Sequence, residues 1–295
     1  MFTRILVPLD GSATAEKVLP YARALARTLE IPVTLMAVIE TGGDFSTDKA
    51  RYLDTLIEEG VRNSEEYLKR ISITFGRATV QCVVEKGKAE EAIIAKAAAN
   101  GGTLITMATH GRSGLNRWLL GSIAEKVVRG AANAVLVIRG NEGATADGET
   151  APDSIIVPLD GSLVAESVLP CTVELAKALN FKVSLLRSYS LKQIIFSFEE
   201  YTPDLDELKE ELKWEAMSYL DEKVAELKSR GLIDVFCFVT EGDAAETIIE
   251  MANGAPNSLI AMSTHSGSGI KHWVLGSVTE KVLRHANNPV LVLRS

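Results

Sequence analysis

Short apolar runs alternate with longer amphipathic stretches along the first half of the chain. Apolar runs bounded by turn-forming residues predict buried strands, and apolar positions three or four residues apart predict helices. The predicted strands are Ile5–Leu9, Val33–Ile39, Thr79–Val84, Leu104–Ala108 and Val135–Ile138. The predicted helices are Ala13–Leu29, Asp48–Ile71, Ala89–Ala99 and Ser122–Ala132. Strands that alternate with helices in this way predict an α/β fold with a parallel sheet that is wound on both faces.

The second half of the chain repeats the first. The stretch RILVPLDGS, which begins at Arg4, recurs as SIIVPLDGS from Ser154, and LLGSIAEKVVR, which begins at Leu119, recurs as VLGSVTEKVLR from Val274. The second half follows the same order of elements, with its long helix predicted at Asp204–Arg230. The repeat therefore predicts two copies of one fold.

The chain has 295 residues, which is room for two domains of about 150 residues each. We expect two doubly wound, five-stranded parallel-sheet domains of the Rossmann-like type in tandem, at residues 1–140 and 153–295. The linker, 141–152, is rich in Gly, Ala and acidic residues and has little to bury. Both domains close on an apolar strand, AVLVIR and PVLVLR, so we expect the halves to pack through these strands as an internal pseudo-dimer.

Charge and composition exclude several classes of partner. A net charge of −8 and a pI near 5.2 leave no basic face for nucleic acid. No apolar run approaches the roughly 18 residues of a membrane span, and the start of the chain is typical of a strand, so a cytoplasmic protein is expected. Cys82, Cys171 and Cys237 are predicted to be reduced thiols of the core.

The duplicated motifs follow two of the predicted strands, where doubly wound folds bind their ligands. Asp10 ends the first strand, and it could either cap the next helix or contact a ligand. The identical VPLDGS around Asp160 favours a role beyond capping, because a cap alone would accept Ser, Thr or Asn equally well. Both roles remain open from the residues alone.

The stretch MATHGRSGLNRWLLGS, from Met107 to Ser122, offers a second part of the site. Gly121 leaves the backbone bare just before a helix, where unpaired N–H groups favour an anion such as phosphate. Thr109 and Ser113 add hydroxyls, and Arg112 adds charge unless it is simply solvated. Ser122 and Ser277, each three residues before a glutamate, match the capping box and are predicted to cap their helices.

Other nucleotide motifs and metal sites are not found in the sequence. No P-loop pattern occurs, and GSGIKH from Gly267 fails the dinucleotide fingerprint at its last position, which argues against a P-loop ATPase and a dehydrogenase. His110 and His265 lack companion ligands at metal-site spacing and are expected to be loop residues. No metal site and no catalytic residue is predicted.

The strand ending VPLDGS, the THGRSG loop, the GS that follows it and the closing AVLVIR strand together resemble the universal stress protein family in its tandem form. The resemblance covers both halves and implies a fold like that of the adenine nucleotide alpha hydrolases. It places Asp10 at the ribose and adenine side, Pro8 and Val38 near the base, and Ala108 where the family's first motif glycine stands. The full set implied in the first half is Pro8, Leu9, Asp10, Val38, Met107, Ala108, Thr109, Gly111, Arg112, Gly114, Gly121, Ser122 and Ile123.

The second half departs from the family motif. Ser263 and Ser266 stand at its two early glycines, and Ser188 stands at the position of Val38. Where a glycine needs positive φ, a serine costs on the order of 1–2 kcal/mol, so we expect the second site to bind about tenfold more weakly. The implied residues are Pro158, Asp160, Met262, Ser263, Ser266, Gly269, Gly276, Ser277 and Val278.

The resemblance implies a stress-response protein that binds an adenine nucleotide (ATP, ADP or AMP), with or without magnesium, and whose bound nucleotide biases a homodimer or a partner contact. One alternative is an interaction module of the same family that binds no nucleotide. The other is a slow ATP hydrolase, which the sequence favours less because no lysine or Walker-type aspartate accompanies the glycines.

Overall fold

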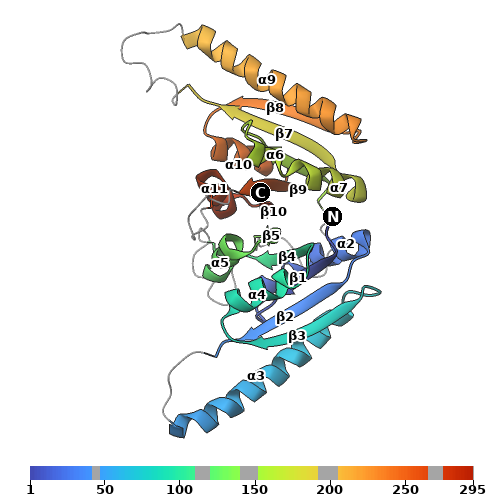
Figure 1. Ribbon diagram of the computed structural model, residues 1–295, viewed down its shortest axis with the longest axis vertical. Coiled ribbons are helices and arrows are strands. Elements are labelled where there is room, and N and C mark those ends of the chain that lie inside the picture. The colour runs from blue at the N-terminus through green and yellow to red at the C-terminus, as the bar shows by residue number, and fades with distance from the viewer. Residues whose placement is uncertain (42–46, 110–119, 140–151, 192–204, 265–274, 295) are drawn as a thin grey trace. The chain divides into compact units, whose positions relative to one another are not determined.

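The computed structural model describes residues 1–41, 47–109, 120–139, 152–191, 205–264 and 275–294, with the backbone alone for residues 47–53. The chain forms two compact units, Met1–Ala151 and Pro152–Leu293. Figure 1 shows the helices and strands of both units in chain order. Each unit is described by itself below.

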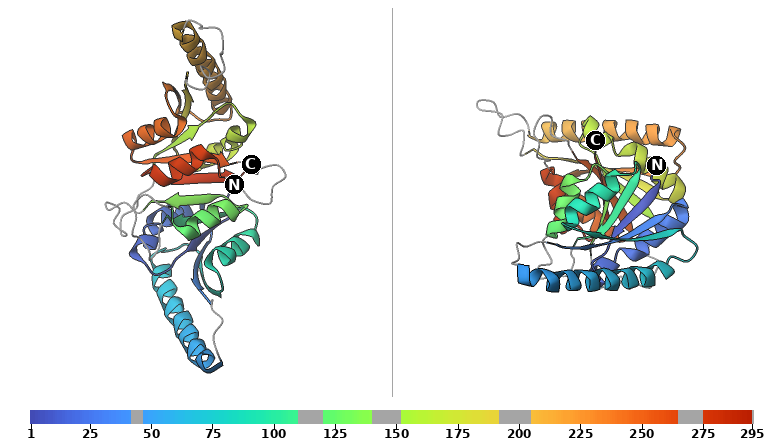
Figure 2. Two further views of the ribbon diagram at one scale, coloured as in Figure 1. Left: turned by 90° about the vertical axis from the view of Figure 1, so that its left-hand side faces the viewer. Right: turned by 60° about the horizontal axis from the view of Figure 1, so that its bottom comes forward.

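The first unit is a parallel sheet in the order β3-β2-β1-β4-β5. The helices α1, α2 and α3 cover one face of this sheet, and α4 and α5 cover the other (Figure 2, left). The strands are β1 Arg4–Pro8, β2 Val33–Ile39, β3 Val80–Lys86, β4 Thr103–Ala108 and β5 Val135–Ile138. The helices are α1 Ala13–Glu16, α2 Leu19–Leu29, α3 Thr47–Ile73, α4 Ala89–Ala98 and α5 Ser122–Gly130.

β1 lies at the centre of this sheet and determines where a ligand can enter. Ile5 is paired with Val33 on one side and with Leu104 on the other, and it is fully buried. An uninterrupted apolar strand of this kind needs cover on both faces. Because the chain leaves β1 towards β2 but returns on the far side at β4, the winding direction changes between β1 and β4, which is the position where doubly wound sheets bind ligands.

The helix predicted at Ala13–Leu29 is wrong as a single element, because the structure breaks it into α1 and α2 at Lys17–Val18. Pro20 stands in the first turn of α2, where the missing N–H costs nothing, whereas inside one continuous helix it would remove a hydrogen bond and clash with the preceding turn. α1 therefore lies close to the carboxyl end of β1 as a separate short helix.

α4 and α5 lie against each other on the second face. A Cβ atom added to Gly130 of α5 would lie 2.6 Å from Cδ1, the far end of the Ile94 side chain of α4, so the two helices are in close contact there. Lys126 of α5 donates to Glu90 of α4 over 2.7 Å. These contacts fix α5, and with it the helix N-terminus that follows Gly121, relative to α4.

The second unit repeats this architecture in the order β10-β9-β6-β7-β8. Pro158 pairs with Leu186 as Pro8 pairs with Met36. The strands are β6 Ser154–Pro158, β7 Lys182–Tyr189, β8 Val235–Glu241, β9 Ser258–Thr264 and β10 Val290–Arg294. The helices are α6 Leu163–Glu166, α7 Leu169–Leu179, α9 Leu205–Ser229, α10 Ala244–Gly254 and α11 Ser277–His285.

The predicted fold class, two tandem α/β domains with parallel sheets, is confirmed. The prediction of three core thiols is wrong for Cys82, which is exposed on the edge strand β3, and for Cys237, which is partly exposed on the edge strand β8. Cys171 is partly buried. Burial, with the Glu174 carboxylate, raises the pKa of Cys171 to about 12.

No described helix has the length and apolar character needed to cross a membrane. The linker prediction falls almost entirely on residues outside the described ranges.

Candidate functional site

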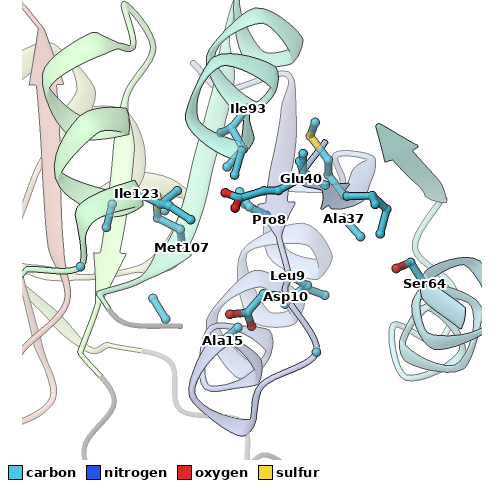
Figure 3. Close-up of a pocket in the computed structure, with 18 of the residues that line it drawn as sticks. Pro8, Leu9, Asp10, Ala15, Ala37, Glu40, Ser64, Ile93, Met107 and Ile123 are labelled. Carbon is cyan, nitrogen blue, oxygen red and sulfur yellow. The ribbon is translucent and has the colours of Figure 1, made fainter. Parts of the chain in front are cut away.

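A cavity of about 680 Å³ lies in the first unit beyond the carboxyl ends of β1, β2 and β4 (Figure 3). This volume is within the usual range for small-molecule sites. The structure brings ten of the predicted first-half residues together on its walls: Pro8, Leu9, Asp10, Val38, Met107, Ala108, Thr109, Gly121, Ser122 and Ile123. The other three, Gly111, Arg112 and Gly114, lie outside the described residues, as does His110.

Asp10 is fixed by the turn that follows β1. Its Oδ1 accepts hydrogen bonds from the Ser12 N–H at 3.0 Å and from the Ser12 hydroxyl at 2.6 Å. The Ser12 oxygen in turn accepts from the Ala15 N–H at 3.1 Å, so Ser12 is the N-cap of α1. Gly11, between them, has φ of +80°, a conformation that glycine adopts at no steric cost. The reading of Asp10 as the helix cap is therefore wrong, and its carboxylate lines the cavity.

The start of α5 forms another wall of the cavity. Gly121 is the N-cap of α5, and its N–H donates to the Thr109 carbonyl over 2.7 Å. A glycine cap has no side chain to offer, so the first N–H groups of the helix, from Ser122 onward, have no partner within the helix. Such groups, with the positive end of the helix dipole, favour an anion.

The predicted capping boxes are wrong. Ser122 and Ser277 are the first residues of their helices, and neither helix has a side-chain cap hydrogen bond. A capping serine must stand one position earlier, in extended conformation, and glycine holds that position in both units. Glu125 instead pairs with Arg129 one turn along α5, at 3.1 Å. Ser122 is thus not the cap of its helix, and it lines the cavity.

The end of β2 and helix α4 give the cavity an apolar wall. Figure 3 shows Pro8, Ala37, Ile93 and Met107 around the cavity, with the Glu40 carboxylate beside Pro8. The cavity therefore joins an apolar region flanked by carboxylates to a helix N-terminus. That combination suits a molecule with an apolar part and an anionic part.

α3 contributes a wall that sequence reasoning missed. Asn63, Ser64 and Tyr67 face the cavity from this helix. The Tyr67 hydroxyl is buried beside the carboxylate of Glu16. Burial first, and then the carboxylates of Glu16 and Asp10, raise the pKa of Tyr67. The repeat could have pointed to Tyr67, because Tyr219 stands at the equivalent position of the second half. A buried leucine follows the tyrosine in both halves.

In the second unit the predicted residues also stand at strand and helix ends. Asp160 accepts from the Ser162 N–H at 2.9 Å, and Gly161 has φ of +89°, as in the first unit. Pro158 ends β6, Met262 and Ser263 lie near the end of β9, and Gly276, Ser277 and Val278 begin α11. Ser266, Gly269 and His265 lie outside the described residues.

Among the residues that the structure describes, no group of three or more His, Cys, Asp or Glu side chains is placed to hold a metal ion.

Both halves of the chain match one family model, described as the universal stress protein family, at residues 1–139 and 152–294. The universal stress protein Rv2005c of Mycobacterium tuberculosis is 24% identical, over 98% of this chain and 96% of the relative. The universal stress protein YxiE of Bacillus subtilis is 28% identical, over 48% of this chain and 99% of the relative.

Among solved structures, the crystal structure of a universal stress protein from Archaeoglobus fulgidus matches with a TM-score of 0.74. It is 20% identical and covers 99% of this chain and 98% of that one. At this identity the likeness concerns the fold.

Proposed function

Because the chain belongs to the universal stress protein family in both of its halves, we propose that its first half binds an adenine nucleotide, ATP, ADP or AMP, in the cavity beyond β1 and β4. The observation that carries the proposal is the glycine-capped start of α5, which faces the same cavity as Asp10. One wall thus favours an anion, and another offers a carboxylate that accepts hydrogen bonds from hydroxyl groups.

The residues of the cavity fit the parts of a nucleotide. The N–H groups of Ser122 and Ile123 and the Ser122 hydroxyl would hold phosphate oxygens, and the Asp10 carboxylate would accept from the ribose hydroxyls. The apolar surface at Pro8 and Val38 would cover the base. The magnesium that accompanies ATP would be bound through its phosphates.

The proposed role is binding rather than turnover. Efficient phosphoryl transfer needs a charge clamp on the transferred phosphate, and the sequence places no lysine or Walker-type aspartate beside these glycines. The bound nucleotide would then act by favouring one oligomeric state or one partner contact. This requires the affinity for nucleotide to differ between the two states.

Isothermal titration calorimetry of the full chain with ATP and magnesium tests this proposal. We expect saturable binding that Asp10→Ala weakens at least tenfold, while the matched variant Asp160→Ala leaves the tightest binding unchanged. Acid extraction of the purified protein, followed by mass spectrometry, identifies any nucleotide carried through purification. If the titration shows no heat of binding and the extract contains no adenine nucleotide, the alternative is favoured, namely an interaction module that binds no nucleotide.

A further inference from the structure

The two units differ at one position that borders the site. Pro8 pairs with Met36 and Pro158 pairs with Leu186, so the next residues along β2 and β7, Ala37 and Arg187, occupy equivalent places. Ala37 lines the cavity of the first unit. An arginine therefore stands in the second unit where the first unit has a methyl group.

The Arg187 guanidinium lies over the turn that follows β6. A Cβ atom added to Gly161 would lie 3.7 Å from both terminal nitrogens of Arg187. Gly161 is the equivalent of Gly11, which lines the first cavity. The arginine thus fills a place that borders open space in the first unit.

Helix α9 holds the guanidinium there. Cζ of Arg187 lies 4.8 Å from the centre of the Tyr219 ring, and Nη2 of Arg187 lies 3.4 Å from Oε1 of Glu215. Only 19% of the Arg187 side chain is exposed, so it is part of the wall rather than a solvated chain. A guanidinium over an aromatic face gains a favourable cation–π interaction.

Tyr219 is fixed in turn by α6. Its hydroxyl donates to Oε1 of Glu166 over 2.9 Å, and the other oxygen of Glu166 accepts from Lys223 over 2.8 Å. The equivalent tyrosine of the first unit, Tyr67, lines the cavity, and its buried hydroxyl lies beside the carboxylate of Glu16, the equivalent of Glu166. The same aromatic residue thus meets an arginine in one unit and borders a cavity in the other.

A second difference lies at the end of β9. The hydroxyl of Ser263 hydrogen-bonds to the carbonyl oxygen of Val164 and lies 3.3 Å from that of Ala165, both in α6. Its equivalent, Ala108, lines the first cavity. The Ser263 proton is therefore committed to α6 and is not available to a ligand.

We propose that Arg187 closes the nucleoside side of the second site, so that the chain binds one adenine nucleotide, in its first half. The identity of the ligand rests on the proposed function. A nucleoside could enter the second site only by displacing the guanidinium from Tyr219 and Glu215 and leaving its charge to be solvated elsewhere. The expected tenfold-weaker second site thus becomes a closed one, and Arg187 is the residue that determines this difference.

A reciprocal exchange tests the proposal, with calorimetric stoichiometry of ATP and magnesium on the full chain as the readout. The wild-type chain is expected to bind one ATP, Arg187→Ala two, and Ala37→Arg none. In the double variant the single site moves to the second half, where Asp160→Ala and not Asp10→Ala abolishes it. Glu215→Ala, which removes the exposed partner but keeps the arginine, is the matched control and should still bind one.

Two ATP molecules on the wild-type chain, or one or none on Arg187→Ala while the wild type binds, would overturn the proposal. A loss of ATP binding in Arg187→Ala would mean that the arginine itself contacts the ligand. If the wild type binds no ATP, the proposed function fails, and the inference is judged by the crystal structure of Arg187→Ala. An open cavity bordered by Pro158, Asp160 and Ser188 would support it, and a site closed by other side chains would overturn it.

Discussion

Gly121 is the residue on which the anion end of the first cavity depends. It gives α5 a cap without a side chain, and it leaves Ser122 as the first helical residue. In sequence, Ser122 followed three residues later by a glutamate matches a capping box, because the sequence does not show whether the serine or the glycine before it is the N-cap. The conformation of the glycine, with ψ of 144°, decides between them.

Replacing Gly121 with valine is expected to weaken ATP binding at least tenfold, or about 1.4 kcal/mol. The backbone at Gly121 has φ of −57°, which valine can adopt, so the effect is a side chain placed between phosphate and the helix N–H groups. The matched control is Gly276→Val, which has the same φ and ψ in the second unit. Equal affinities in wild type and Gly121→Val would contradict this placement of the phosphates.

Two serines that look alike in sequence are expected to differ in their effect on stability. Ser12→Ala removes a cap hydrogen bond of 3.1 Å and should lower the free energy of unfolding by about 1 kcal/mol. Ser122→Ala removes no cap and should change it by less than about 0.5 kcal/mol. Urea unfolding of both variants without nucleotide compares them, and an equal loss for the two would restore Ser122 as a cap.

At the scale of elements, the strands were largely predictable because buried parallel strands are continuous apolar runs, and β2 and β5 have the predicted bounds. The break between α1 and α2 was readable from Pro20, but the periodicity across it favoured one helix. The contribution of α3 to the site was not predictable. Its register against the sheet depends on tertiary packing, and only that packing turns Asn63 and Tyr67 towards the cavity.

The link between α6 and α9 gives a prediction on pH. Burial disfavours the charge of Glu166, but hydrogen bonds from Lys223 and Tyr219 outweigh it and lower the pKa of Glu166. A carboxylate whose pKa is lowered by folding stabilises the folded state at pH values above its pKa in the unfolded chain, about 4.3. This stabilisation is lost as the pH falls through the pKa in the folded state.

Glu166→Gln is therefore expected to lower the free energy of unfolding by about 1–2 kcal/mol at pH 7, and the difference from wild type should shrink as pH falls from 5 to 3. Urea unfolding across this range measures it. Glu211→Gln, at an exposed position of α9, the helix that carries Tyr219 and Lys223, serves as control. A difference that stays constant with pH would mean that the carboxylate charge does not act through this link.

At the scale of the whole molecule, the duplication was plain in sequence, because two motifs recur in the same order. The inequality of the two units was only half visible. The serines at the second glycine motif suggested a weaker site, whereas the exchange of Ala37 for Arg187 gains meaning only once β7, α9 and Gly161 are together in space. The packing of the halves through their last strands stays a prediction, which cross-linking mass spectrometry of the full chain can check.

Native mass spectrometry of the full chain with excess ATP tests the central claim most directly, because it counts bound nucleotides on intact molecules. We expect one nucleotide mass per chain, absent from Asp10→Ala and Gly121→Val and retained in Asp160→Ala and Gly276→Val. A chain that stays free of nucleotide under these conditions, or one that loses its nucleotide only in the second-half variants, would contradict a nucleotide site in the first half.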